Sequence, residues 1–131
     1  MLVRTEKMPQ IPKRPKTVRV HTPIGTAVVL WRGDPQEAEG HHLVEWTIDD
    51  DIHWGQNARS ASCAEPGIQQ DVDRLVLRGR LQLSEAGAAY LQMGYWPILL
   101  DVASPIRDSA DGAWVEISVE ASSVSLYPYQ T

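Results

Sequence analysis

Three arginines, Arg74, Arg78 and Arg80, are separated by even numbers of residues, four and then two. Apolar residues alternate with them between residues 72 and 83, so a strand here would present the arginines together on one face. At about 3.3 Å per residue, Arg78 and Arg80 would project about 6.6 Å apart. Such a row matches the phosphates of a nucleic-acid backbone or the carboxylates of a protein partner. The alternative is an exposed face whose arginines pair with acidic residues of neighbouring strands.

Trp114 is the second candidate for binding. The strand expected over residues 113–119 has one apolar face, and Trp114 and Glu116 lie on the other face. A tryptophan on a polar face can stack on a base or anchor a protein partner. The alternative is that another segment covers it. We therefore predict a partner-binding face made of Trp114, Glu116 and the arginine row.

Four residues in adjacent segments have the side-chain types of a metal site: His41, His42, Glu45 and His53. Three such ligands and a water would make a catalytic zinc centre, which is the basis of a metal-assisted hydrolase hypothesis. No HExxH spacing is present, and polar residues are expected after the loop that precedes His41. We therefore expect no metal and no cofactor.

The remaining reactive residue types form no recognisable catalytic pattern. Cys63 has no neighbour at a spacing that would activate a thiol. The triplet 49–51 lacks the alternating ligands, glycine and terminal glutamate of a calcium loop, which predicts a solvated acidic turn. A nucleophile elbow, a phosphate-binding loop and a dinucleotide fingerprint are also absent from the sequence.

Short strands separated by Gly, Pro and Asp loops must position these residues. Period-two alternation is clearest over 72–83, and the stretch 56–70 has no regular pattern. The last strand-like stretch is a short strand or a docked tail. Strand-like stretches are 18–21, 26–31, 43–48, 52–55, 72–83, 97–103, 113–119 and 124–129.

One helix is predicted over Glu85–Met93, with Ser84 as its N-cap and Gly94 at its end. Its apolar stripe would consist of Ala86, Ala89, Tyr90 and Met93. The expected fold is mainly β: a small barrel or sandwich, SH3-like or OB-like, of about six or seven short strands with one short helix.

The net charge of −5 is unevenly distributed along the 131 residues. Residues 1–20 hold six basic residues against one acidic residue, a net of +5, and the remaining 111 residues hold six against sixteen, a net of −10. Prolines at every third position from Pro9 to Pro15 favour an extended conformation. We predict a basic, Pro-rich tail over 1–17, with Lys13, Arg14 and Lys16 as its contact residues, and a single β-rich domain over 18–131.

These features favour a small binding protein without catalytic activity. Its acidic body would engage a protein partner, as an inhibitor, an immunity-type protein or an assembly subunit. The alternative from another class is a nucleic-acid-binding module that uses the arginine row and the basic tail. The single cysteine favours a reducing compartment, and the sequence has no secretory signal and no membrane span. We therefore expect a cytoplasmic protein.

Overall fold

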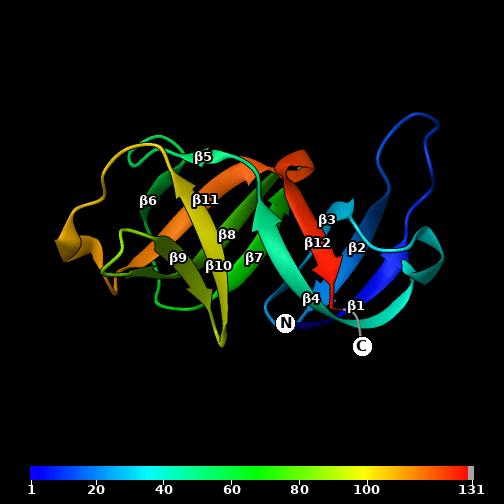
Figure 1. Cartoon of the computed structure of the whole chain (residues 1–131), viewed down its shortest axis with the longest axis horizontal. Coiled ribbons are helices and arrows are strands. Elements are labelled where there is room, and N and C mark those ends of the chain that lie inside the picture. Colours follow the sequence, from blue (N-terminus) through cyan, green and yellow to red (C-terminus); the bar gives the residue numbers. More distant parts are fainter. Residues whose placement is uncertain (130–131) are drawn as a thin grey trace.

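The computed structural model describes residues 1–129; residues 130 and 131, at the end of the predicted domain 18–131, lie outside the described residues. The described chain is mainly β, with twelve strands, three short 3-10 turns and no α-helix (Figure 1). It holds no helix that is long and apolar enough to cross a membrane. The strands are β1 (Leu2–Lys7), β2 (Thr17–Thr22), β3 (Gly25–Trp31), β4 (Gly40–Ile48), β5 (Asp51–Ile52), β6 (Ala58–Ser60), β7 (Gly67–Asp71), β8 (Arg74–Leu83), β9 (Ala89–Met93), β10 (Trp96–Val102), β11 (Trp114–Glu120) and β12 (Val124–Pro128). The 3-10 turns are η1 (Pro35–Glu37), η2 (Asp108–Ala110) and η3 (Ala121–Ser123).

Five strands close into a mixed barrel. β1 pairs with β2 and β4, β2 pairs with β3, and β12 pairs with β4, all antiparallel. The parallel pairing of β12 with β3 closes the ring. The spatial order β4-β1-β2-β3 is a Greek key, in which the fourth strand returns to lie beside the first.

The other strands form a second group, β5 to β11, which the chain inserts between β4 and β12 (Figure 1). β8 is its centre and pairs with β7, β9 and β11. β10 and β5 extend the group beyond β9, and β6 pairs with β11. A bridge between Gly25 of β3 and Ile68 of β7 joins the group to the barrel. A Cβ at Gly25 would collide with the carbonyl oxygen of Ile68, and φ there is +149°, so both packing and backbone require glycine.

One hydrophobic core serves both groups of strands. Alternation along β8 buries Leu75, Leu77 and Leu81 and leaves the arginines on the outer face, as the sequence predicts. The same alternation in β11 buries Val115, Ile117 and Val119. Barrel strands contribute further fully buried residues, among them Val18, Val20, Val29 and Leu126.

The predicted helix over Glu85–Met93 is wrong, because this stretch is a tight turn followed by β9. The turn is closed by Ser84, whose backbone N–H donates to the oxygen of Ala88 and whose hydroxyl accepts from the nitrogen of Ala88. Gly87 has φ +84°, which a glycine adopts without strain. Alternate residues Ala89, Leu91 and Met93 are then buried, so a period of two prevails over the helical stripe.

The segment 1–17 is not a detached tail. Residues 2–7 form β1, a central strand of the barrel, with Val3 and Thr5 facing the core. Residues 8–16 are the loop from β1 to β2, which extends away from the barrel in Figure 1. The stretch 56–70 likewise contains β6 and the start of β7. Together with β1 and with β9 in place of the helix, these are four strands that the sequence did not predict, and they bring the count in the described chain to twelve.

Candidate nucleic-acid interface

The predicted binding residues of β8 and β11 lie on one outer face. The register places Arg80 opposite Trp114, Arg78 opposite Glu116, and Arg74 opposite Glu120. Directly opposite side chains in an antiparallel pair have their Cβ atoms about 4.5–5.5 Å apart. The antiparallel pairing of these two strands therefore brings together the five residues that the sequence singles out.

Each arginine of the row is held by an acceptor of its own sheet or of a neighbouring loop. The Nε of Arg80 donates to the oxygen of Gly112 at 3.1 Å, and the Nε of Arg78 donates to the oxygen of Glu65 at 2.7 Å. Arg74 donates to the hydroxyl of Ser118 at 3.0 Å and to its carbonyl oxygen at 2.8 Å. These bonds hold the arginines against the protein.

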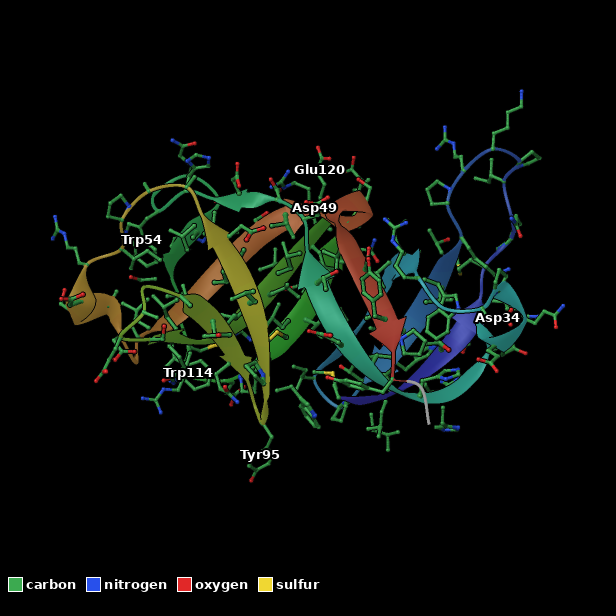
Figure 2. All side chains as sticks on the ribbon, in the orientation of Figure 1. Asp34, Asp49, Trp54, Tyr95, Trp114 and Glu120 are labelled. Atoms are coloured by element: carbon green, nitrogen blue, oxygen red, sulfur yellow. The ribbon has the colours of Figure 1, made fainter. Side chains whose placement is uncertain are left out.

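Glu116 neutralises part of the same face. Its carboxylate lies 3.3 Å from Nη2 of Arg59 and 3.7 Å from Nη1 of Arg78, and its side chain is only 12% exposed. Arg59 enters this cluster from β6, within a stretch that has no periodicity to reveal it in the sequence. Trp114, labelled in Figure 2, is half-buried beside these groups and is not a fully exposed platform.

A second positively charged surface lies on the barrel. We call it the basic face; it consists of Arg4 on β1, Arg19 on β2, Lys7 at the end of β1, and Lys13, Arg14 and Lys16 in the loop 8–16. All except half-buried Lys16 are exposed. Within residues 1–129, the ion pairs of this set involve Arg4 alone, which lies 2.9 Å from Glu6. The other five cations are free of carboxylate partners in that part of the chain.

The loop of the basic face has a defined conformation. Lys13 has φ +66°, and the N–H of Arg14 donates to the oxygen of Ile11 at 3.2 Å, so residues 11–14 form a turn. The base of the loop is tied to the barrel because the N–H of Trp31 donates to the oxygen of Lys16 at 2.9 Å. The loop thus holds its three cations between the end of β1 and the start of β2.

A polar row crosses the barrel strands three residue pairs away from the loop along β1 and β2. The register places His41 opposite Arg4, Arg4 opposite His21, and His21 opposite Thr26, across β4, β1, β2 and β3. Glu6 lies two residues beyond Arg4 on β1, opposite Arg19, and its carboxylate contacts Nε2 of His21 at 2.9 Å. The hydroxyl of Thr26 lies 3.4 Å from Nδ1 of the same imidazole.

The hydrogen bond from Arg4 lowers the pKa of Glu6, and His21 adds to this effect by its own hydrogen bond and charge. Sequence reasoning missed this row, since it assigned residues 1–17 to a tail. The alternation of Leu2, Arg4 and Glu6 with Val3 and Thr5 is the signal that could have revealed β1 and its outward residues.

The four residues of the metal hypothesis are not brought together. His41 and Glu45 share the outer face of β4, but His42 lies on the opposite face and packs against Trp31 with ring centroids 5.0 Å apart. His53 follows β5, where its N–H donates to Oδ1 of Asn57 at 2.7 Å. Across residues 1–129 the structure contains no group of three or more His, Cys, Asp or Glu residues that could hold a metal ion.

Acidic residues gather around η3, near the start of β8. Asp49 is tied to this turn because its N–H donates to the oxygen of Ser123, and Asp73 is tied to it because its oxygen accepts from Ala121, both at 2.8 Å. Figure 2 shows Asp49 and Glu120 next to each other. We call this set the acidic pole; its members are Asp49, Asp50, Asp51, Asp71, Asp73 and Glu120.

Two hollows of about 450 and 330 Å³ lie beside the loop 103–112 and share Pro105 and Ile106 in their walls. The larger one is bounded by Trp54, which is partly exposed. Serine, alanine and proline make up much of both linings, and no arrangement for catalysis is present in them.

No protein-family model, curated protein or solved structure matches the chain significantly.

Proposed function

We propose that the protein binds single-stranded nucleic acid through the basic face. The observation that carries this proposal is the absence of carboxylate partners for Lys7, Lys13, Arg14, Lys16 and Arg19 within the described residues. When cations of a protein neutralise the phosphates of a nucleic acid, condensed counterions are released. This release supplies much of the free energy of binding. Cations without an internal partner give that gain without breaking an existing ion pair.

The barrel topology supports the same surface. The order β1-β2-β3-β12-β4 of the closed five-stranded barrel favours the OB-like expectation over the SH3-like one. Barrels of the OB type bind oligonucleotides on the face of their second and third strands and on the loop between the first and second. Here that loop is 8–16, and Arg19 and His21 lie on the outer face of β2. This is an analogy of fold, and the charges of the face are the independent support.

The arginine row is a weaker candidate for the same ligand. Arg59 and Arg78 already share Glu116, and Arg74 lies opposite Glu120 within the acidic pole. A phosphate would have to displace these acceptors or approach their carboxylates. We therefore assign the first contact with nucleic acid to the basic face.

Fluorescence anisotropy with labelled single-stranded DNA, single-stranded RNA and duplex DNA tests the proposal. We expect the single strands to bind more tightly than about 10⁻⁴ M at low salt, with an affinity that falls as salt is added. The matched comparison is Lys13→Ala/Arg14→Ala/Lys16→Ala against Arg74→Ala/Arg80→Ala. Binding that is absent, or that is lost only in the β8 variant, contradicts the proposal.

A second candidate function is the binding of a basic protein partner at the acidic pole. Val72 favours this function because it is 88% exposed at the tip of the β7–β8 turn, between Asp71 and Asp73. Its φ of +56° is unusual for a β-branched side chain and holds an apolar group outward among carboxylates. An apolar anchor surrounded by charge is typical of a protein-binding surface.

The test of this second candidate is a pull-down from the native organism with stoichiometry measured by mass spectrometry. A partner of the acidic pole is retained by the triple alanine variant of the loop and lost with Asp71→Lys/Asp73→Lys. Recovery of the same proteins in the same amounts with both variants contradicts it.

A further inference from the structure

The polar row on the barrel contains the groups of an acid–base catalyst. His41, Arg4 and His21 are consecutive cross-strand neighbours on β4, β1 and β2, so the arginine lies between the two imidazoles. With strands about 4.8 Å apart, the backbones that carry the two histidines are about 10 Å apart. Imidazole side chains on both sides of one phosphate would span this separation.

The row combines cations that attract an anionic substrate with one carboxylate, that of Glu6, on which Arg4 and His21 converge. Glu6 contacts Nε2 of His21 at 2.9 Å and thereby orients the ring. Nδ1, which lies 3.4 Å from the hydroxyl of Thr26, is the nitrogen left for proton transfer once that hydroxyl rotates away. Arg4 uses Nη1 for Glu6 at 2.9 Å, and its guanidinium has further N–H groups available for a phosphate. Arg19 lies on the same outer face of the barrel, directly opposite Glu6.

We propose that this face cleaves single-stranded RNA, with His21 and His41 as the general acid and base; the proposal rests on the nucleic-acid binding proposed above. One imidazole removes the proton of a ribose 2′-hydroxyl, and that oxygen forms a bond to the adjacent phosphorus. The bond from phosphorus to the 5′-oxygen of the next nucleotide breaks, and the other imidazole protonates this oxygen. The products are a 2′,3′-cyclic phosphate and a free 5′-hydroxyl.

The chemistry selects RNA because the nucleophile is the substrate's own 2′-oxygen, so the reaction consumes no water and no co-reactant in this step. The two histidines touch the reacting oxygens, and Arg4 contacts the phosphate and stabilises the charge that develops on it. Glu6 touches His21 and not the substrate, and is therefore a positioning residue. Its replacement in Glu6→Gln should lower kcat by a larger factor than it changes KM.

The experiment incubates the purified full chain with a short labelled RNA, with its 2′-O-methyl analogue and with DNA of the same sequence. We expect cleavage of the RNA alone and a product whose mass identifies a 2′,3′-cyclic phosphate. His21→Gln and His41→Gln should each lower the rate by about 10²-fold or more, which is the usual contribution of a general acid or base. His53→Gln is the matched control, because His53 lies beyond β5 and outside the row.

Binding and cleavage fail in distinguishable ways. Tight binding of RNA and of its 2′-O-methyl analogue without cleavage overturns this inference and leaves the proposed binding function intact. Cleavage that persists unchanged in both histidine variants also overturns it, because neither histidine then takes part in the reaction. Absence of binding to every oligonucleotide overturns both proposals. Circular dichroism of each variant shows that it is folded.

Discussion

The protein carries two positively charged surfaces that differ in how their charges are satisfied. On β8, Arg74, Arg78 and Arg80 donate to oxygens of Ser118, Glu65 and Gly112, and Arg78 also approaches Glu116. On the barrel, the cations of the basic face other than Arg4 have no carboxylate partner within the described residues. The first surface is more regular in the sequence, but the second has more charge available to a ligand.

The difference shows that a regular row of charge in a sequence does not by itself indicate a binding site. Guanidinium groups on a sheet have many acceptors within reach, and each bond they make stabilises the fold. In the loop 8–16, Lys13 and Arg14 are exposed and Lys16 donates to Oε1 of Gln10 at 3.4 Å, so no carboxylate among residues 1–129 holds any of the three. We therefore assign stability to the arginine row and binding to the basic face.

Charge reversal in the loop should have the largest effect on binding. In Lys13→Glu/Arg14→Glu/Lys16→Glu, three phosphate contacts are replaced by three repulsions, and the affinity for single-stranded nucleic acid should fall roughly 100-fold at low salt. The plot of log affinity against log salt concentration should become shallower by about 2, at about 0.7 for each contact to a single strand. Fluorescence anisotropy over a salt series measures both. An unchanged slope would show that the loop does not touch the phosphates.

The arginine row should respond in stability and not in binding. Arg78→Ala removes the bond to Glu65 and leaves Glu116, which is only 12% exposed, with Arg59 alone. We expect the free energy of unfolding to fall by about 1–2 kcal/mol, with nucleic-acid affinity within about twofold of the wild-type value. Arg14→Ala is the matched control and should change stability by less than about 0.5 kcal/mol. Urea denaturation of the two variants measures the difference, and equal stabilities would contradict this assignment.

Removal of one carboxylate from each surface sharpens the comparison. Glu6→Gln deletes the carboxylate of the basic face and frees Arg4, so the salt slope of binding should steepen by about 0.7. Glu116→Gln frees Arg59 and Arg78 on the other surface and should leave the slope unchanged. The same anisotropy series distinguishes them. A steeper slope in Glu116→Gln alone would move the interface to β8.

The smallest expected effect is on the pH dependence of stability. The pKa of Glu6 is lowered in the folded protein, so its contribution to stability is present above the pKa of the unfolded chain and is lost as the pH falls through the folded value. Wild-type protein should therefore lose its advantage over Glu6→Gln between neutral pH and acid pH below that value. Thermal melts of both proteins across this range measure it, and a constant difference in Tm would show that the contact of Glu6 with Arg4 and His21 adds no pH-dependent stability.

Local alternation predicted the strands that carry the arginine row. The leucines of β8 and the apolar set of β11 have a strict period of two, because one face is buried and the other is exposed. This pattern was sufficient to place Arg78 and Glu116 on polar faces, although it could not pair them across strands. The pairing depends on register, which only the folded sheet defines.

The basic face could not be found in the same way. Its row forms only when β4, whose residues are about forty positions away in sequence, returns to pair with β1. The prolines at 9, 12 and 15 obscured the short strand before them, and they belong to the loop that follows it. The helix predicted at 85–93 failed for a related reason, because Ala89 and Met93 fit both the helical stripe and a strand in which Leu91 is buried between them, and only the turn at Gly87 decides between the two.

The most direct test of the account is a map of the binding surface by NMR. Amide shifts of the labelled protein are followed while a short single-stranded oligonucleotide is added at low salt. The account predicts the largest shift changes at residues 4–21, including the loop 8–16 and His21, with little change at residues 74–80 and 114–118. Changes concentrated on β8 and β11, with residues 4–21 unaffected, would contradict it.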